Sequence, residues 1–353
     1  MTTSLKVNSD RAIAWWLLTG VAMIIVQILL GGITRLTGSG LSITEWNVVT
    51  GTLPPLSEQQ WMLEFEKYRQ TPQFRLLNFD FTISDFKSIF FWEWFHRFWA
   101  RLIGVVFAIP FIYFLLTKKF KKSMIQPMLI LFLLGALQGA IGWIMVASGL
   151  TGDAIYVKPT RLALHFIFAL GLLSYTYWFA LELLVPVSSR IENSSVKKRT
   201  NWIILLLFFQ LIYGALMAGH KAATVAPTWP TINGEWLPAS LFKSSEGWLN
   251  LIDNTITIHF IHRGLAYLLL LLIVWLSISL KKIKGDALFE KIKWTPLVFI
   301  FIQVALGIFS VLTSLQIIPG QWGVFESLAQ IHQLVAMLLL VSLVSLRYLV
   351  RSN

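Results

Sequence analysis

The amino-acid sequence predicts an all-α integral membrane protein with eight transmembrane helices, arranged as two four-helix bundles related by a pseudo-two-fold axis. Composition is the first observation behind this prediction. Of the 353 residues, 56% are hydrophobic and 13% are charged, whereas soluble domains carry about 25% charged residues. The second observation is a set of eight apolar stretches, each near the roughly 20 residues that a membrane helix needs. The third is a series of motifs that recurs in the same order in both halves of the chain.

We assign one membrane helix to each apolar stretch. The stretches cover residues 12–33, 92–116, 124–147, 161–184, 202–219, 256–280, 294–315 and 328–349. The longest connection, residues 35–90, follows the first stretch, and its residues 57–69 have the amphipathic pattern of a surface helix. Small residues let membrane helices approach one another closely. We expect this role for Gly31, Gly32, Gly135, Gly139, Gly142, Gly214 and Gly307.

Basic residues are concentrated in the loops after the second, fourth and sixth predicted spans. They are Lys118, Lys119, Lys121, Lys122, Arg190, Lys197, Lys198, Arg199, Lys281, Lys282, Lys284, Lys291 and Lys293. Short loops rich in lysine and arginine stay on the cytoplasmic side of a membrane. We therefore expect a cytoplasmic N-terminus and C-terminus, and we interpret the net charge of +12 as a topology signal and not as a nucleic-acid surface.

The chain contains no cysteine, which excludes disulfides, thiolate metal sites and iron–sulfur ligation by its own residues. Residues 1–10 lack the apolar core of a secretory signal and the composition of an organelle transit peptide. These features favour a multi-pass protein of the bacterial plasma (inner) membrane.

An internal repeat relates the two halves of the chain. Gln27 and Gly31 match Gln210 and Gly214, 183 residues further on. Further matches, at separations of 165 to 167 residues, are His96 with His262, Arg97 with Arg263, Gln138 with Gln303, Gly142 with Gly307, and His165 with His332. Four matched spans in unchanged order indicate a duplicated four-helix unit. We predict an N-terminal half, residues 1–190, and a C-terminal half, residues 191–353.

Four histidines occupy equivalent places in the predicted topology. His96, His165, His262 and His332 lie near the beginnings of the second, fourth, sixth and eighth spans, which all enter the membrane from the outer side. They are expected at similar depth, just inside the outer boundary, with one pair in each half. Ionisable residues inside a membrane are costly and are usually functional.

Paired histidines without thiolates favour a haem whose iron is bound by two imidazoles, because bundle interiors hold flat cofactors. Zinc usually takes three or four protein ligands, and each half supplies only two of these histidines. A di-iron centre needs several carboxylates, and only Glu93 lies in a comparable place. A proton relay through Glu93 and the histidines would not explain their duplication.

Residues beside these histidines complete the candidate site. Glu93 lies three residues before His96 on the same helical face, and its repeat partner is His259. We expect His259 to support the C-terminal pocket. Arg97 and Arg263 are candidates to pair with haem propionates, with interfacial snorkelling as the alternative.

Several motifs resemble those of the haem A synthases. They are Gly31-Gly32-Ile33-Thr34-Arg35-Leu36-Thr37-Gly38-Ser39-Gly40-Leu41-Ser42-Ile43-Thr44-Glu45-Trp46, Gly51-Thr52-Leu53-Pro54-Pro55, Glu93-xx-His96-Arg97, Pro227-Thr228-Trp229-Pro230 and His262-Arg263-Gly264. The resemblance covers essentially the whole chain. It is closest to the cysteine-free type found in alphaproteobacteria and mitochondria.

This resemblance implies an oxidoreductase that oxidises the ring methyl of haem O to a formyl group, giving haem A for cytochrome oxidase. It assigns His262 and His332 to the iron of a resident b-type haem. It assigns His96 and His165 to the iron of the substrate haem, with Glu93 as a catalytic acid. It also implies a functional link to a haem O synthase and to cytochrome oxidase assembly, and an electron donor that the sequence does not identify.

Two other classes remain open from the residues alone. The first is a membrane electron-transfer cytochrome with two bis-histidine haems and no substrate chemistry, which leaves Glu93 unexplained. The second is a transporter with parallel four-plus-four repeats, which would bind no chromophore.

Overall fold

The computed structural model describes residues 2–46, 50–241, 247–318 and 320–352, and within these ranges nearly all regular secondary structure is helical. Eight helical segments are long and apolar enough to cross a membrane, as the sequence predicts. They are α1 (Thr2–Leu36), α4 (Ile83–Leu116), α5 (Lys122–Ala147), α6 (Pro159–Leu184), α7 (Ser194–Gly219), α9 (Thr255–Leu280), α10 (Ala287–Ile292) with α11 (Thr295–Leu312), and α12 (Val324–Leu349). The predicted all-α membrane fold is confirmed.

Shorter elements connect these helices. They are η1 (Thr50–Thr52), α2 (Glu58–Arg69), α3 (Pro72–Leu76), η2 (Val187–Ser189), η3 (Ala222–Thr224), η4 (Gly247–Leu249), α8 (Asn250–Asp253) and η5 (Ser314–Gln316). The strands β1 (Ile191–Glu192) and β2 (Val350–Arg351) pair in parallel. This pairing connects the segment between α6 and α7 to the segment that follows α12.

Local sequence signals set where the long helices begin. In lipid, a helix satisfies its backbone groups internally, but the first turn needs outside acceptors. Thr82 and Asp85 form a reciprocal cap at the start of α4. The side chains of Asn193 and Asn254 accept backbone N–H groups at the starts of α7 and α9. Pro159 occupies the first position of α6, where its missing N–H costs nothing.

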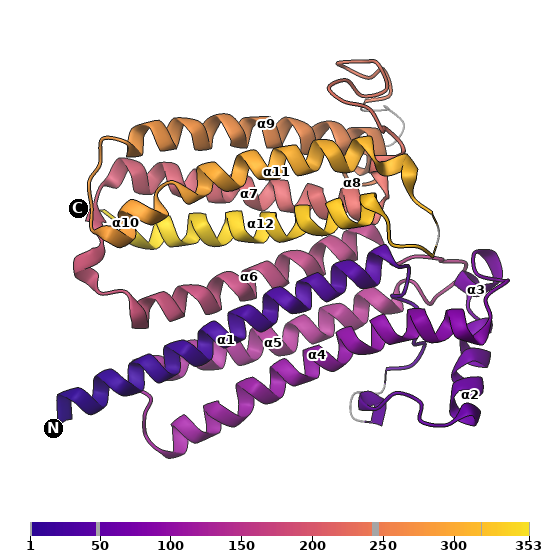
Figure 1. Cartoon of the computed structure of the whole chain (residues 1–353), viewed down its shortest axis with the longest axis horizontal. Helices are drawn as coiled ribbons and strands as arrows, with labels where there is room; N and C mark the ends of the chain where they lie inside the picture. Colours follow the sequence, from indigo (N-terminus) through magenta and orange to yellow (C-terminus); the bar gives the residue numbers. More distant parts are fainter. Residues whose placement is uncertain (1, 47–49, 242–246, 319, 353) are drawn as a thin grey trace.

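The membrane helices form two groups that share one core. In the first group, α1 packs against α4 and α6, and α5 packs against α6. In the second group, α7 packs against α9 and α12, and α11 packs against α12 and α9. The groups meet where α6 contacts α7 and α12, and where α1 contacts α12 (Figure 1). The largest cluster of buried apolar side chains contains residues of α1, α6, α7, α9, α11 and α12, so it spans both groups.

Polar contacts tie the two groups together between α12 and α1. Gln330 Nε2 donates to the carbonyl of Leu29 over 3.0 Å, and Gln333 Nε2 donates to the carbonyl of Ile28 over 2.9 Å. A side chain at Gly32 would begin 2.5 Å from the amide oxygens of both glutamines. Gly32 therefore allows the close approach that the sequence predicted for it.

The first and second groups differ at one equivalent pair of helices. In the second group α9 packs against α11, whereas the matching helices of the first group, α4 and α5, do not pack along their lengths. Gly135 and Gly139 of α5 were expected to permit close packing. That prediction is wrong, because a side chain added at either glycine would meet nothing within 4 Å. The neighbouring helix α4 lies too far from these two glycines to fill the space beside them.

The long outer connection folds onto the beginning of α4. The predicted surface helix is observed as α2, capped by Ser57. Phe65 and Tyr68 of α2 pack against Phe74 of α3 and Phe86 of α4, with ring centroids 5.2 to 5.9 Å apart. The predicted amphipathic face thus covers the start of a membrane helix.

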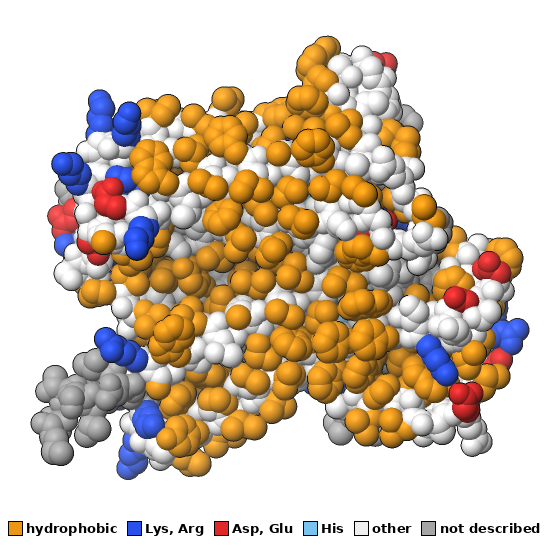
Figure 2. Space-filling view, viewed as in Figure 1, with side chains coloured by type: hydrophobic (Ala, Val, Ile, Leu, Met, Phe, Trp, Pro, Cys, Tyr) orange, Lys and Arg blue, Asp and Glu red, His pale blue; other side chains and the backbone are white. Residues whose placement is uncertain are grey.

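Charged side chains lie mainly at the two ends of the molecule (Figure 2). Between them runs a broad band of apolar side chains, as expected for a surface in contact with lipid. Both chain termini lie at the same end (Figure 1). An even number of spans produces this arrangement.

Candidate functional site

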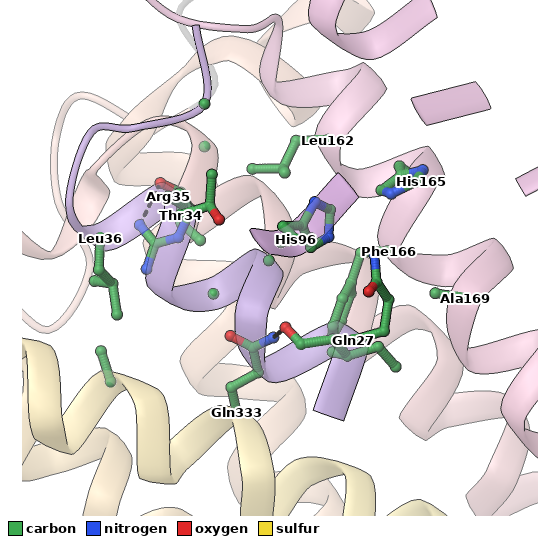
Figure 3. A pocket seen from close by; sticks show the side chains of 18 of the residues that line it. Gln27, Thr34, Arg35, Leu36, His96, Leu162, His165, Phe166, Ala169 and Gln333 are labelled. Atoms are coloured by element: carbon green, nitrogen blue, oxygen red, sulfur yellow. Dashed lines mark hydrogen bonds between the residues drawn. The ribbon is translucent and has the colours of Figure 1, made fainter. Parts of the chain in front are cut away.

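One cavity of about 1810 Å³ extends between the helices and receives side chains from both groups. Ligand pockets usually measure about 300–1,000 Å³, so this cavity has room for more than one large ligand. All eight candidate site residues line it: Glu93, His96, Arg97, His165, His259, His262, Arg263 and His332. Figure 3 shows His96 and His165 directed into the same space from α4 and α6.

Each histidine of the two predicted pairs is opposed by a glycine on a neighbouring helix. A Cβ atom at Gly31 would lie 3.3 Å from His96 Nε2, and one at Gly142 would lie 2.9 Å from His165 Cε1. In the second half, a Cβ at Gly214 would lie 3.3 Å from His262 Cε1, and one at Gly307 would lie 3.1 Å from His332 Cε1. The glycines therefore give the four imidazoles room to project into the cavity.

A glutamine precedes each of these glycines by four residues and lies beside the same space. Gln138 Nε2 lies 3.2 Å from His165 Nδ1, and Gln303 Nε2 lies 3.2 Å from His332 Nε2. Gln210 Nε2 lies 3.5 Å from His262 Nε2. Gln27 points toward the space between His96 and His165 (Figure 3). In the sequence these glutamines were recognised only as markers of the repeat, although four amides at one register inside apolar spans are a signal of function.

Several polar atoms around the cavity are buried and have no hydrogen-bond partner within the described ranges. They are the Oε1 atoms of Gln27, Gln138, Gln210 and Gln303, the Nδ1 atoms of His262 and His332, and both ring nitrogens of His259. Buried polar groups are normally paired, so a cluster of unpaired ones indicates a missing partner. The residues that lack partners converge on the histidine pairs.

These observations fit haem better than a metal ion bound by protein alone. A porphyrin supplies four nitrogen ligands to its iron and needs two more, which a pair of neutral imidazoles provides. In the described part of the chain, no three histidine, aspartate or glutamate side chains come together closely enough to hold an ion. The glycines make room for the four imidazoles, and the Nδ1 atoms of His262 and His332 have no partner within the described ranges.

Glu93, near the first histidine pair, accepts several hydrogen bonds. Its Oε1 accepts from Arg97 over 2.6 Å, and its Oε2 accepts from the Ser42 hydroxyl over 2.7 Å and the Ile43 amide over 2.9 Å. The residue is 2% exposed and none of these bonds reaches His96. Three donors, one of them the guanidinium of Arg97, thus hold the carboxyl group in place.

Arg97 and Arg263 hold the outer loops at equivalent points. Arg97 donates to the carbonyls of Ile43 and Glu45, at 3.1 Å each. Arg263 donates to the carbonyl of Thr228 over 2.6 Å, and Thr228 is the repeat partner of Glu45. The guanidinium groups of both arginines already donate hydrogen bonds to loop carbonyls. Their pairing with haem propionates therefore stays a prediction.

The other two histidines differ in their surroundings. His259 is fully buried at the edge of the C-terminal part of the cavity, at the position equivalent to Glu93. His220 lies outside the residues that line the cavity, and its Nε2 bonds to the carbonyl of Ile252 over 2.8 Å. It fastens the end of α7 to α8.

Two further arginines line the cavity although the sequence analysis assigned them no role. Arg35, at the end of α1, donates to the carbonyl of Ala218 over 3.3 Å. Ala218 is the repeat partner of Arg35, so this bond joins matching points of the two halves. Arg101 lies one helical turn beyond Arg97, and its repeat partner is Tyr267. An arginine inside an apolar span was the signal that could have identified it.

Comparisons with known proteins agree over nearly the whole chain. A family model described as cytochrome oxidase assembly protein matches residues 14–344. The haem A synthase of Parvibaculum lavamentivorans is 40% identical over 329 residues, which cover 93% of this chain and 91% of that protein. The haem A synthase of Flavobacterium johnsoniae is 38% identical over 94% of this chain and 96% of its own length. That of Paracoccus denitrificans is 41% identical over 85% and 80%, respectively.

Proposed function

The chain belongs to the haem A synthase family of cytochrome oxidase assembly proteins, and we propose on this basis that it oxidises the ring methyl of haem O to a formyl group. The product is haem A. Two successive oxidations of the methyl carbon, followed by loss of water from the hydrated product, account for the change. The enzyme is thus an oxidoreductase of haem biosynthesis whose product serves cytochrome oxidase.

The observation that carries this proposal is the duplicated histidine pair in a single cavity, with an acid in only one copy. In both pairs, each histidine faces a glycine of a neighbouring helix, and glutamines lie beside the histidines. Glu93 in the first half is replaced by His259 in the second. An electron-transfer protein with two equivalent haems would not need this difference.

We assign the N-terminal half, residues 1–190, to the substrate. His96 and His165 would hold the iron of haem O and so fix the porphyrin in the cavity. Glu93 lies beside this space as a buried acid held by Arg97 and by the loop that carries Ser42 and Ile43. A fixed carboxylate can take up a proton or stabilise positive charge as the methyl carbon is oxidised.

We assign the C-terminal half, residues 191–353, to a resident b-type haem held by His262 and His332. When bound, this group supplies one-electron redox chemistry. Gln210 and Gln303 lie within reach of the two imidazoles, and His259 closes the same part of the cavity. Arg97 and Arg263 are the candidates to bind propionates at the outer end.

The topology proposed for the enzyme follows from its loops. The end that carries both termini also carries the basic loops after the second, fourth and sixth spans, so we place this end in the cytoplasm. The cavity then opens toward the outer side of the bacterial plasma membrane. Haem O would come from a haem O synthase acting earlier in the same biosynthesis.

Pigment analysis of the purified protein tests the proposal. We expect a visible haem spectrum, and extraction followed by mass analysis should yield haem B together with haem O or haem A. Haem B alone, at two per chain, would instead support an electron-transfer cytochrome. A colourless protein would support the transporter.

A further inference from the structure

The space between α4 and α5 is a slot that leads into the N-terminal part of the cavity. Ala100 and Gly104 of α4 line it on one side, and Gly135, Ala136 and Gly139 of α5 line it on the other. All five are exposed, and a Cβ atom built at Gly104, Gly135 or Gly139 would meet no atom within 4 Å beyond the adjacent part of its own helix. The slot therefore contains open space, although small residues at this spacing usually mark close helix contacts.

The neighbouring helices leave the slot uncovered. α4 packs mainly against α1 and α2, and α5 packs mainly against α6, so no described helix bridges α4 and α5 at the depth of the slot. Nearer the outer end, the Trp46 ring lies against Arg97 of α4 and Trp143 of α5. Near the loop that joins the two helices, Phe114 of α4 and Met128 of α5 share one apolar cluster, which closes the inner end. Exposed apolar side chains border the slot, among them Val105 and Phe132. Lipid is the medium that such side chains meet in a membrane.

The matching place in the C-terminal half is filled by larger residues. Gly104 corresponds to Leu270, Gly135 to Ile300 and Gly139 to Val304. Ile300 is 2% exposed in the main core, and Leu270 and Val304 pack against that core. There α9 and α11 lie in contact. The two halves thus share a histidine pair, but only the first half has an open side.

The depth of the slot relates it to the histidines. Gly104 lies eight residues beyond His96 on α4, and Gly135 lies seven residues before Gly142 on α5. At 1.5 Å per residue, both glycines lie roughly 10–12 Å deeper in the membrane than the histidine pair. A flat ligand held at His96 and His165 could extend an apolar chain into the slot and onward into lipid.

We propose that the slot between α4 and α5 is the lateral entrance of the N-terminal pocket, which admits a porphyrin with a long isoprenoid chain from the bilayer. This inference rests on the proposed function, because haem O carries such a chain. An amphiphile of this kind dissolves in lipid, and the slot lets its tail stay there while the ring enters. The closed C-terminal half suits a cofactor that is not exchanged.

Filling the slot with the residues of the other half tests the proposal. In protein reconstituted in lipid nanodiscs with its resident haem, the double variant Gly135→Ile with Gly139→Val should slow the uptake of added haem O about tenfold, because the new side chains narrow the slot. This change equals about 1.4 kcal/mol of added barrier. The spectrum of the resident haem should not change. The control is Ala140→Val, which enlarges a neighbouring side chain on the same helix but outside the cavity lining.

Chemical blocking of the slot gives a second measurement on protein that has already folded. Because the chain has no cysteine, Gly139→Cys carries the only thiol. Labelling it with N-ethylmaleimide should slow haem O uptake, whereas labelled Ala140→Cys should take up haem O at the unlabelled rate. Uptake at the wild-type rate in both the double variant and the labelled protein would overturn the lateral entrance. Failure of the wild type to bind haem O at all would instead overturn the proposed function.

Discussion

At the residue scale, the site depends on atoms whose orientation no sequence pattern reveals. The spacing of three residues predicts that Glu93 and His96 share a helical face, and both line the cavity. Glu93 nevertheless bonds to Arg97, one turn further along, and to the loop above. The acid thus fixes the outer loop over the pocket, and any proton transfer by Glu93 takes place within that network.

We expect Glu93→Gln to separate binding from chemistry. The amide can still accept from Ser42 and Ile43, but the charge that pairs with Arg97 is lost. Conversion of haem O to haem A should fall by about 10²-fold or more, the range for removing a general acid or base. The ratio of haem O to haem A in extracted pigment measures this effect. Glu58→Gln, at an exposed acid of α2, is the control, and a normal ratio in Glu93→Gln would remove Glu93 from the mechanism.

We expect Gln303→Leu to weaken the affinity of the C-terminal pocket for the b-type haem proposed to bind there. Groups that bond to a metal-bound imidazole orient it, and their loss costs about 10- to 100-fold in affinity. Gln303→Glu keeps the shape of the side chain but lacks the amide N–H that faces His332 Nε2, so it should not restore that affinity. Haem titration and the reduction potential measure the effect, with the exposed Gln316→Leu as control. Unchanged affinity and potential would show that Gln303 only fills space.

At the element scale, each membrane helix has its own task in positioning the site. α4, α6, α9 and α12 carry the histidines, while α1, α5, α7 and α11 carry the glutamine–glycine motifs that face them. The outer helices α2 and α3 fasten the beginning of α4 through a cluster of aromatic rings. The position of Glu93 therefore depends on a segment that lies outside the membrane.

The outer segment should loosen at high pH. Burial raises the pKa of Tyr68 from 10.0 to about 12, so the folded segment holds the phenol proton more tightly than the unfolded segment does. The stability of the segment should be constant below pH 10 and fall between pH 10 and 12, by up to about 3 kcal/mol at 1.36 kcal/mol per pKa unit. A phenolate absorbance titration of the wild type minus that of Tyr68→Phe measures this. A difference titration centred at pH 10 would contradict it.

At the scale of the whole molecule, the two halves are joined by packing that neither half could make alone. The main core contains side chains from both, and the glutamines of α12 bond to the backbone of α1. The contact is matched by apolar packing between α6 and α7, where Ala163 lies with Ala215 and Leu216. Ala163 is the repeat partner of Gln330. The hydrogen bonds between α12 and α1 therefore have no equivalent between α6 and α7 at this position.

We expect the double variant Gln330→Leu with Gln333→Leu to lower the stability of the whole protein. Hydrogen bonds between membrane helices contribute about 0.6 kcal/mol on average and up to about 1.7 kcal/mol. Thermal unfolding, followed through the resident haem and through an N-terminal label, should show both halves melting earlier and together. Loss of stability in one half alone would show that the halves fold as independent units. Unchanged melting would show that these glutamines contribute nothing.

Sequence patterns predicted the eight spans and the histidine pairs because hydropathy and duplication act over many residues. They did not predict the slot, because the glycines of α5 look the same whether a helix lies against them or not. The same holds for Arg97, whose partners Ile43 and Glu45 are backbone carbonyls that leave no trace in residue identity. Features that depend on which helix stands next to which required the structure.

The contact between α12 and α1 also has a consequence for the order of synthesis. The bonded residues are separated by 301 and 305 positions in the chain. At about 5–20 residues per second, the ribosome needs about 15–60 s to make the intervening chain. During that interval the face of α1 around Gly32 lies in the membrane without α12, which contacts it in the complete protein. α1 is the first helix made, yet its contacts are among the last to form. The cavity is complete only when α12 has been synthesised.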